Sequence, residues 1–158
     1  MNKTMKDVYV VLHNVHAVSK VIETAQVVYG LGFPNFVVSK AEGSAAQTGV
    51  PESNRLALKM KGSFAVLPDI RDVLEMLDVD RPLMVTSPVL VKERLNTDEI
   101  SKKIGNGERV VIVFSGSNSS FSRKEMDMGE CVSLNARVDI GPAGSAAIVL
   151  HEIAGKTA

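Results

Sequence analysis

The sequence has 158 residues, of which 45% are hydrophobic and 23% are charged. These values are typical of one folded domain and argue against extended disorder. Eighteen basic residues balance eighteen acidic ones, so the formal net charge is zero and no overall attraction to nucleic acid is expected. We therefore expect a single domain over residues 1–158, in which any binding of nucleic acid depends on a local patch.

Signals for export or membrane insertion are weak in this sequence. The apolar run Val8–Leu12 is too short for the core of a signal peptide, and no stretch reaches the roughly 20 apolar residues that span a membrane. The lone Cys131 cannot form an internal disulfide, which favours a reducing compartment. The sequence therefore predicts a cytoplasmic protein without membrane contact.

Apolar strands alternate with amphipathic helices along the chain. The first strand, Val8–Leu12, is apolar throughout, as in a strand covered on both faces, and Asn14 is placed to cap the helix that follows. Residues 42–53 read as a loop with one helical turn. Later strands are predicted at Asn35–Ser39, Phe64–Leu67, Leu83–Thr86 and Val110–Phe114, with an extended piece at 131–134. Later helices are predicted at Asn54–Met60, Ile70–Leu77, Glu99–Ile104 and from Pro142 to Ile153.

This alternation predicts an α/β fold with a mainly parallel sheet and helices on both of its faces. Such sheets bind ligands beyond the carboxyl ends of their strands. The loops expected at that edge are residues 13–16, 86–88, 115–122 and 140–145.

Two of these loops carry weak chemical signals. In the first, either His13, Asn14 or His16 faces a ligand, or the segment is a helix cap with two solvated imidazoles. The Gly/Ser/Asn loop at 115–120 lacks the spacing of a phosphate-binding loop. Its small side chains leave main-chain groups free to bond an adenine or a ribose, although a flexible surface loop has the same composition.

A metal centre is not predicted from spacing. One cysteine and three scattered histidines give no zinc motif. A metal-dependent nuclease needs clustered carboxylates, for which Asp69 after Pro68 is a candidate, but no Asp/Glu-x-Lys follows at close range. The G-x-S-x-G turn of a serine hydrolase is absent as well.

Four segments, in the same order, resemble the SpoU branch of the SPOUT RNA methyltransferases. The last, from Ala146 to Ile153, is the most specific and is similar to that family's final A-A-x-A-L-Y-E helix. The other three are Asn14 through Glu23-Thr24-Ala25 to Tyr29-Gly30, then Val111–Ser117, then Val138–Pro142. The resemblance spans nearly the whole chain and implies a C-terminal trefoil knot, a homodimer and S-adenosylmethionine bound in the knotted loops.

The chain departs from the SpoU pattern at the residues that carry catalysis. Lys20 or Glu23 stands where the family has arginine, and Ser117 or Asn118 where it has glutamate. The family's S-L-N before the last helix falls near Gly141 and Pro142. The resemblance therefore implies the cofactor-binding fold more strongly than ribose 2′-O methylation.

The expectation from the resemblance is an S-adenosylmethionine-binding methyltransferase that acts on RNA. One alternative is a SPOUT-fold dimer that binds cofactor or RNA without transferring a methyl group, and another is a nucleotide binder on an unknotted sheet. Catalysis would fall to Asn14, His16 and Lys20. The cofactor would contact Thr86, Ser87, Pro88, Ser115, Gly116, Ser117, Ile140, Pro142 and Gly144.

Overall fold

The computed structural model describes residues 3–157, and its centre is a six-stranded sheet in which every paired strand is parallel. The strand order is β3-β2-β1-β5-β4-β6. The strands are β1 (Val8–Val15), β2 (Asn35–Ala41), β3 (Ser63–Leu67), β4 (Leu83–Val85), β5 (Val110–Ser115) and β6 (Glu130–Val132). The helices are η1 (Lys3–Asp7), α1 (Val18–Gly30), η2 (Ala45–Gly49), α2 (Val50–Met60), α3 (Ile70–Leu77), α4 (Thr97–Gly105), α5 (Arg123–Met126) and α6 (Pro142–Thr157).

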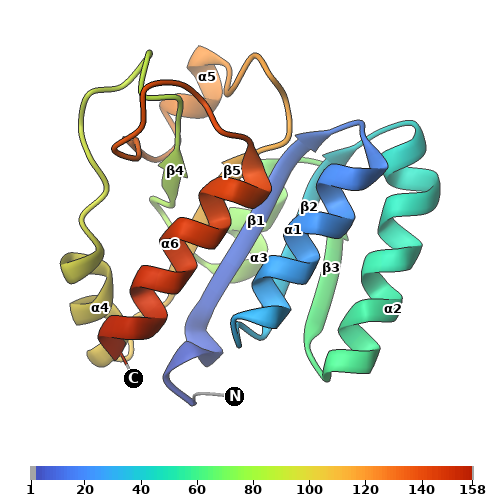
Figure 1. The fold of residues 1–158 in the computed structure, drawn as a ribbon, viewed down its shortest axis with the longest axis horizontal. Helices are drawn as coiled ribbons and strands as arrows, with labels where there is room; N and C mark the ends of the chain where they lie inside the picture. Colours follow the sequence, from blue (N-terminus) through green and yellow to red (C-terminus); the bar gives the residue numbers. More distant parts are fainter. Residues whose placement is uncertain (1–2, 158) are drawn as a thin grey trace.

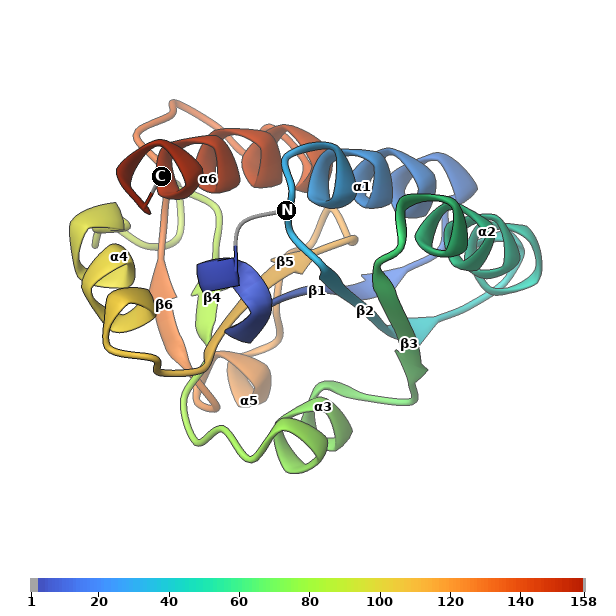
Figure 2. The ribbon, with the colours of Figure 1, turned by 90° about the horizontal axis from the view of Figure 1, so that it is seen from below.

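The helices form a layer on each face of the sheet. Helices α1, α2 and α6 lie side by side on one face, and α4 packs against α6 at the β4–β6 end. Helices α3 and α5 lie on the opposite face (Figure 2). The carboxyl ends of the strands share one edge, at the top of Figure 1.

Strand β1 is the central strand of the sheet and is buried on both faces. Val8, Val10 and Leu12 belong to the core beneath α1 and α6, whereas Val11 belongs to the core beneath α3. Full burial of such an aliphatic side chain contributes about 1.5–3 kcal/mol. By the alternation of strand side chains, His13 lies on the same face as Val11, and it is fully buried.

The predicted α/β fold with a parallel sheet and helices on both faces is confirmed. The predicted trefoil knot fits the strand order and stays a prediction. Among residues 3–157, no helix is long and apolar enough to cross a membrane.

Some local predictions were wrong. Asn14 does not cap α1, because it lies within β1 with a φ of 62°, and Ala17 is at the N-cap position. Helix α4 is capped by Asn96, whose side chain accepts from two backbone N–H groups, and it begins at Thr97, two residues before the predicted start. Helix α2 begins at Val50, four residues before the predicted start, and the short helix α5 was missed.

Gly116 directly follows β5, where β5 and β1 approach closely. A Cβ atom added at Gly116 would lie 2.6 Å from Val15 Cβ and 2.9 Å from the Asn14 carbonyl oxygen. We predict that Gly116→Ala lowers the free energy of unfolding by about 1–3 kcal/mol, since the backbone of β1 has to shift. The matched control is Gly155→Ala in α6, where nothing lies within 4 Å of the added atom. Urea denaturation measures both, and equal stability of the two variants would contradict this packing.

Candidate functional site at the carboxyl edge of the sheet

The site is built around the buried imidazole of His13 near the end of β1. In the sheet register His13 lies between Ser39 of β2 and Ser115 of β5. Its Nδ1 shares a hydrogen bond of 2.8 Å with the Ser39 hydroxyl, and its ring stacks on Phe121 with centroids 6.3 Å apart. Both contacts fix the plane of the ring, so Nε2 points toward α3 and α5.

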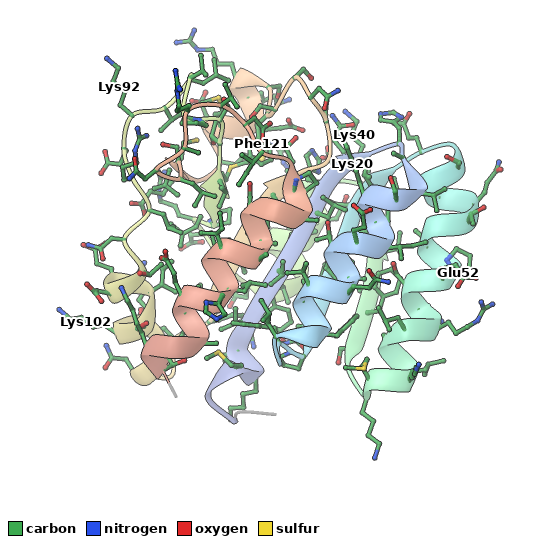
Figure 3. The ribbon with its side chains drawn as sticks, in the orientation of Figure 1. Lys20, Lys40, Glu52, Lys92, Lys102 and Phe121 are labelled. Carbon is green, nitrogen blue, oxygen red and sulfur yellow. The ribbon has the colours of Figure 1, made fainter. Side chains whose placement is uncertain are left out.

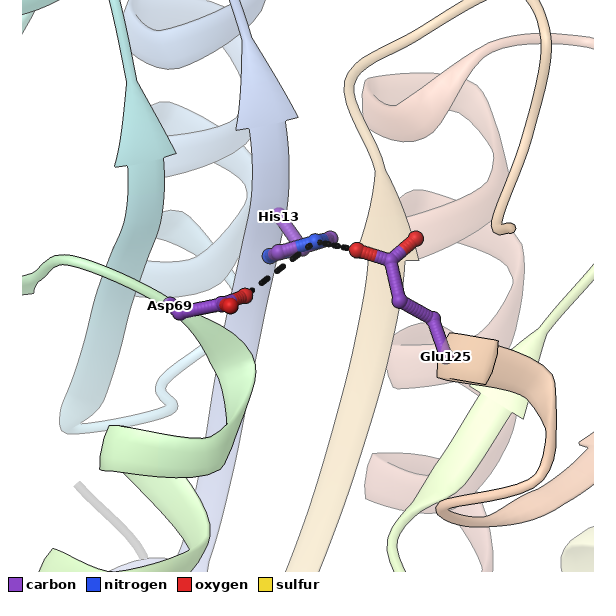
Figure 4. A group of neighbouring side chains, drawn as sticks. All are labelled: His13, Asp69 and Glu125. Atoms are coloured by element: carbon purple, nitrogen blue, oxygen red, sulfur yellow. Dashed lines mark hydrogen bonds and ion pairs between the residues drawn. The ribbon is translucent and has the colours of Figure 1, made fainter. Parts of the chain in front are cut away.

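Two carboxylates converge on Nε2 from these helices, as Figure 4 shows. Asp69 is at the N-cap position of α3, where its Oδ1 accepts the Ile70 N–H at 2.7 Å. Glu125 is in α5 and forms a capping box with Ser122, so its Oε1 accepts the Ser122 N–H at 2.8 Å. The two acids therefore have fixed positions set by the starts of two helices.

Distances to His13 Nε2 differ between the two carboxylates. Glu125 Oε2 lies 2.5 Å away, and Asp69 Oδ1 lies 3.9 Å away. Burial raises the pKa of Glu125, but the Ser122 N–H, the hydrogen bond from His13 and its charge outweigh this effect, so the pKa is lowered from its usual value. Glu125 is therefore ionised near neutral pH and accepts the hydrogen bond from Nε2.

The two acids border an open groove between α3 and α5. Its lining residues carry both signs of charge, with the cations Arg71 and Lys124 beside the carboxylates. The full lining is Asp69, Arg71, Asp72, Ser122, Lys124, Glu125 and Met128. The Asp69 side chain is 55% exposed, so the cluster opens to solvent on this side. A groove with cations beside a histidine and two carboxylates can bind a phosphate group next to groups that orient or deprotonate water.

The predicted cofactor residues lie around a different pocket, on the opposite face of the sheet. Phe114 lines that pocket and belongs to the core beneath α1 and α6, whereas Phe121 beside His13 belongs to the core beneath α3. Six of the predicted residues line it, namely Thr86, Ser87, Pro88, Ser115, Ile140 and Pro142. Gly116, Ser117 and Gly144 are outside the lining, and their contact with a cofactor stays a prediction.

The predicted catalytic residues Asn14, His16 and Lys20 lie near the end of β1, directly after it and in the first turn of α1, and their role in catalysis stays a prediction. His16 is exposed, and its carbonyl oxygen accepts hydrogen bonds from Ser44 and Ala45. Lys20, labelled in Figure 3, reaches from α1 to the loop after β5, where its Nζ donates to Gly116 O at 3.0 Å and to Asn118 Oδ1 at 3.2 Å. Lys20 therefore holds this loop in place.

Sequence reasoning found one acid of the cluster and missed the other. Asp69 was recognisable because an acid after Pro68 opens a helix. Glu125 lies 56 residues further along, in a helix of only four residues, and no short motif joins it to His13. The one usable signal was Ser122-x-x-Glu125, the spacing of a capping box.

Comparison with known proteins places the chain in a family. The model of a family described as RecB-family nuclease (DUF2122) matches residues 43–152. A protein of Aeropyrum pernix is 37% identical over 151 residues, covering 92% of this chain and 91% of its own. The chain belongs to this DUF2122 family. The Aeropyrum protein and a second relative from Methanocaldococcus jannaschii, which is 27% identical over 154 residues, both carry the provisional name of a type II restriction enzyme.

The same chain is similar in fold to SPOUT methyltransferases. A structure from Bordetella pertussis, titled a probable methyltransferase, superposes with a TM-score of 0.77 at 13% identity and covers 99% of this chain and 97% of that one. The SpoU methyltransferase AviRb of Streptomyces viridochromogenes, solved with S-adenosylmethionine, has a TM-score of 0.69 at 13% identity, covering 96% of this chain and 61% of its own. At such identities the likeness establishes a SPOUT-like fold alone.

The prediction of a methyltransferase that acts on RNA is therefore wrong. The family model and both sequence relatives are named for nucleases. The family model matches residues 43–152, and the alignments with the two relatives cover 92% and 96% of this chain. The resemblance captured the architecture, which SPOUT methyltransferases share, and not the activity.

The contact between His13 and Glu125 can be tested through stability. We predict that Glu125→Ala lowers the free energy of unfolding by about 3 kcal/mol, because it leaves a fully buried imidazole without its partner. Lys124→Ala, one residue earlier in α5 and exposed, is the control and should change stability little. Chemical denaturation in EDTA measures both. A loss for Glu125→Ala no larger than for Lys124→Ala would contradict the contact.

Proposed function

We propose that this protein hydrolyses phosphodiester bonds of DNA in the groove between α3 and α5. The observation that carries the proposal is the convergence of a buried imidazole and two carboxylates beside two cations, in a chain of a nuclease family. The provisional naming of both relatives as type II restriction enzymes supports DNA as the substrate class.

In this proposal the groove residues divide the work by charge and exposure. Arg71 and Lys124 bind the phosphate and offset its negative charge. Asp69, the more exposed carboxylate, orients the attacking water. The water oxygen forms a new bond to phosphorus as the P–O bond to one sugar breaks, the water gives up a proton to solvent, and the leaving oxygen takes one up from solvent. His13 and Glu125 form the rigid floor that fixes the position of Asp69 relative to the phosphate.

Cleavage of duplex DNA tests the proposal. We predict that the purified protein nicks or cuts plasmid DNA in the presence of Mg²⁺ or Mn²⁺, and that Asp69→Asn lowers the rate by about 100-fold or more. Asparagine still caps α3, so the fold should be retained. The matched control is Asp78→Asn at the other end of α3, where the left-handed φ of 53° suits asparagine.

Total RNA is tested as a second substrate in the same assay, to compare the rates of RNA and DNA cleavage. Equal rates of DNA cleavage by the wild type and Asp69→Asn would show that the reaction does not take place in this groove. No cleavage of DNA by the wild type under any of these ions would overturn the proposed function.

A second candidate function is binding of S-adenosylmethionine in the pocket at the ends of β4 and β5. The six predicted residues that line this pocket support it, as does the cofactor bound in the AviRb structure. Main-chain groups and small side chains there fit an adenosyl group. The cavity volume is about 20 Å³, room for about one water molecule, so the pocket has to widen before an adenosyl group fits.

Cofactor binding in this pocket can be tested with a residue that lines it. We predict that S-adenosylmethionine binds the wild type in a calorimetric titration, and that Ala136→Phe weakens it by about 10-fold or more by filling the pocket. Asn135→Phe, at the exposed neighbouring position, should leave the affinity unchanged. Absence of heat with the wild type would exclude the cofactor, and equal affinity of the two variants would exclude this pocket.

A homodimer remains part of the proposal. Three exposed apolar side chains lie on or just before α6, namely Val138, Ile140 and Ile148, which are 59%, 44% and 44% exposed. We predict that the protein sediments as a dimer at micromolar concentration, with an interface above about 1,000 Å². Ile148→Glu would place a charge in the dimer interface and should therefore shift the protein from dimer to monomer. A wild type that sediments as a monomer would contradict the dimer.

A further inference from the structure

Two carboxylates that line the groove and the buried imidazole behind them have the composition of a metal site. His13, Asp69 and Glu125 each offer one ligand atom, and these atoms all lie within 4.8 Å of one another. One is an imidazole nitrogen and two are carboxylate oxygens, which together suit first-row divalent ions. They come from β1, from the start of α3 and from α5, so three separate elements hold them around one point (Figure 4).

His13 and Glu125 each have their other polar atom held by a neighbour. Ser39 Oγ lies 2.8 Å from His13 Nδ1 and is itself fully buried, and the Ser122 N–H is bonded to Glu125 Oε1 at 2.8 Å. His13 Nε2 and Glu125 Oε2, which bond to each other, are therefore the atoms that remain to face Asp69. Outer contacts of this kind orient metal ligands and select the imidazole tautomer.

We propose that His13 Nε2, Asp69 and Glu125 Oε2 bind one divalent transition-metal ion, with Mn²⁺ or Zn²⁺ favoured over Mg²⁺. This inference rests on the proposed function in one respect, since it assigns a metal to the same site. The ion takes the place of the proton in the hydrogen bond between His13 Nε2 and Glu125 Oε2. In the metal-bound form the imidazole carries its proton on Nδ1, where Ser39 Oγ accepts it.

Small movements are enough to form the site. Metal–ligand bonds of about 2.1 Å place neighbouring ligand atoms roughly 3 Å apart. The distance from Nε2 to Glu125 Oε2 therefore widens from 2.5 Å, and the distance to Asp69 closes from 3.9 Å. Asp69 is the half-exposed member, so its side chain has the freedom to move.

The nitrogen ligand decides the choice of ion. Imidazole binds Mn²⁺, Zn²⁺ and other transition metals more readily than it binds Mg²⁺ or Ca²⁺, which prefer oxygen ligands alone. Three protein ligands leave further positions open toward the groove, where Arg71 and Lys124 lie. Open positions are the mark of a catalytic rather than a structural metal site.

Titration with Mn²⁺ tests the site without any substrate. The chelator-stripped wild type should bind one Mn²⁺ per chain, measured by the loss of the free-ion electron paramagnetic resonance signal, and Zn²⁺ should displace it. Asp69→Asn should weaken binding about 10-fold or more, and Ser39→Ala by about 10-fold through the loss of ring orientation. Asp78→Asn, which carries the same exchange at the far end of α3, should bind as the wild type does.

Thermal unfolding of each variant without metal separates loss of a ligand from loss of the fold. A wild type that binds neither ion at millimolar concentration would overturn the site, as would an Asp69→Asn variant with unchanged affinity. Metal binding without DNA cleavage would support the metal site and overturn the proposed nuclease activity. DNA cleavage in excess EDTA would support the nuclease activity and overturn the metal site.

Discussion

The buried imidazole of His13 is the constraint on which this edge of the molecule depends. A polar ring with no solvent contact must find partners inside the protein for both nitrogens. Ser39 provides one from the neighbouring strand, and Glu125 provides the other from a helix more than a hundred residues away. The short helix α5 has no fully buried residue, and it is held to the sheet by this contact together with Met126, which packs against the core beneath α3.

The same edge presents two different surfaces, one on each face of the sheet. At the start of α6 lies the pocket proposed to bind S-adenosylmethionine. Beneath α3 lies the His13 cluster with its charged groove. A parallel sheet brings all its strand ends together, so both surfaces are available to one fold. The two proposed functions, DNA hydrolysis and S-adenosylmethionine binding, therefore use different surfaces of this edge and do not exclude each other.

The elements with a clear hydrophobic pattern could be predicted from sequence, whereas only His13 and Asp69 of the site were candidates and Glu125 was not. Strands β1, β2 and β5 contain the apolar runs VYVVL, FVV and VVIVF, and apolar residues of helix α1 recur every three or four positions, so the α/β fold could be predicted. Asn14 was predicted to cap α1 because asparagine is a common N-cap residue. In the structure Asn14 lies within β1 and has a positive φ. The His13 cluster joins residues 13, 69 and 125 through long-range packing, which leaves no local spacing in the sequence.

If DNA is hydrolysed in the groove between α3 and α5, nucleic acid binds on that face rather than at the pocket near the start of α6. Backbone amide chemical-shift mapping by NMR distinguishes the two, with a short DNA duplex added in Ca²⁺ to suppress turnover. The largest shifts are expected on residues 69–72 and 122–128. Shifts confined to residues 86–88 and 136–145 would contradict binding of DNA in this groove.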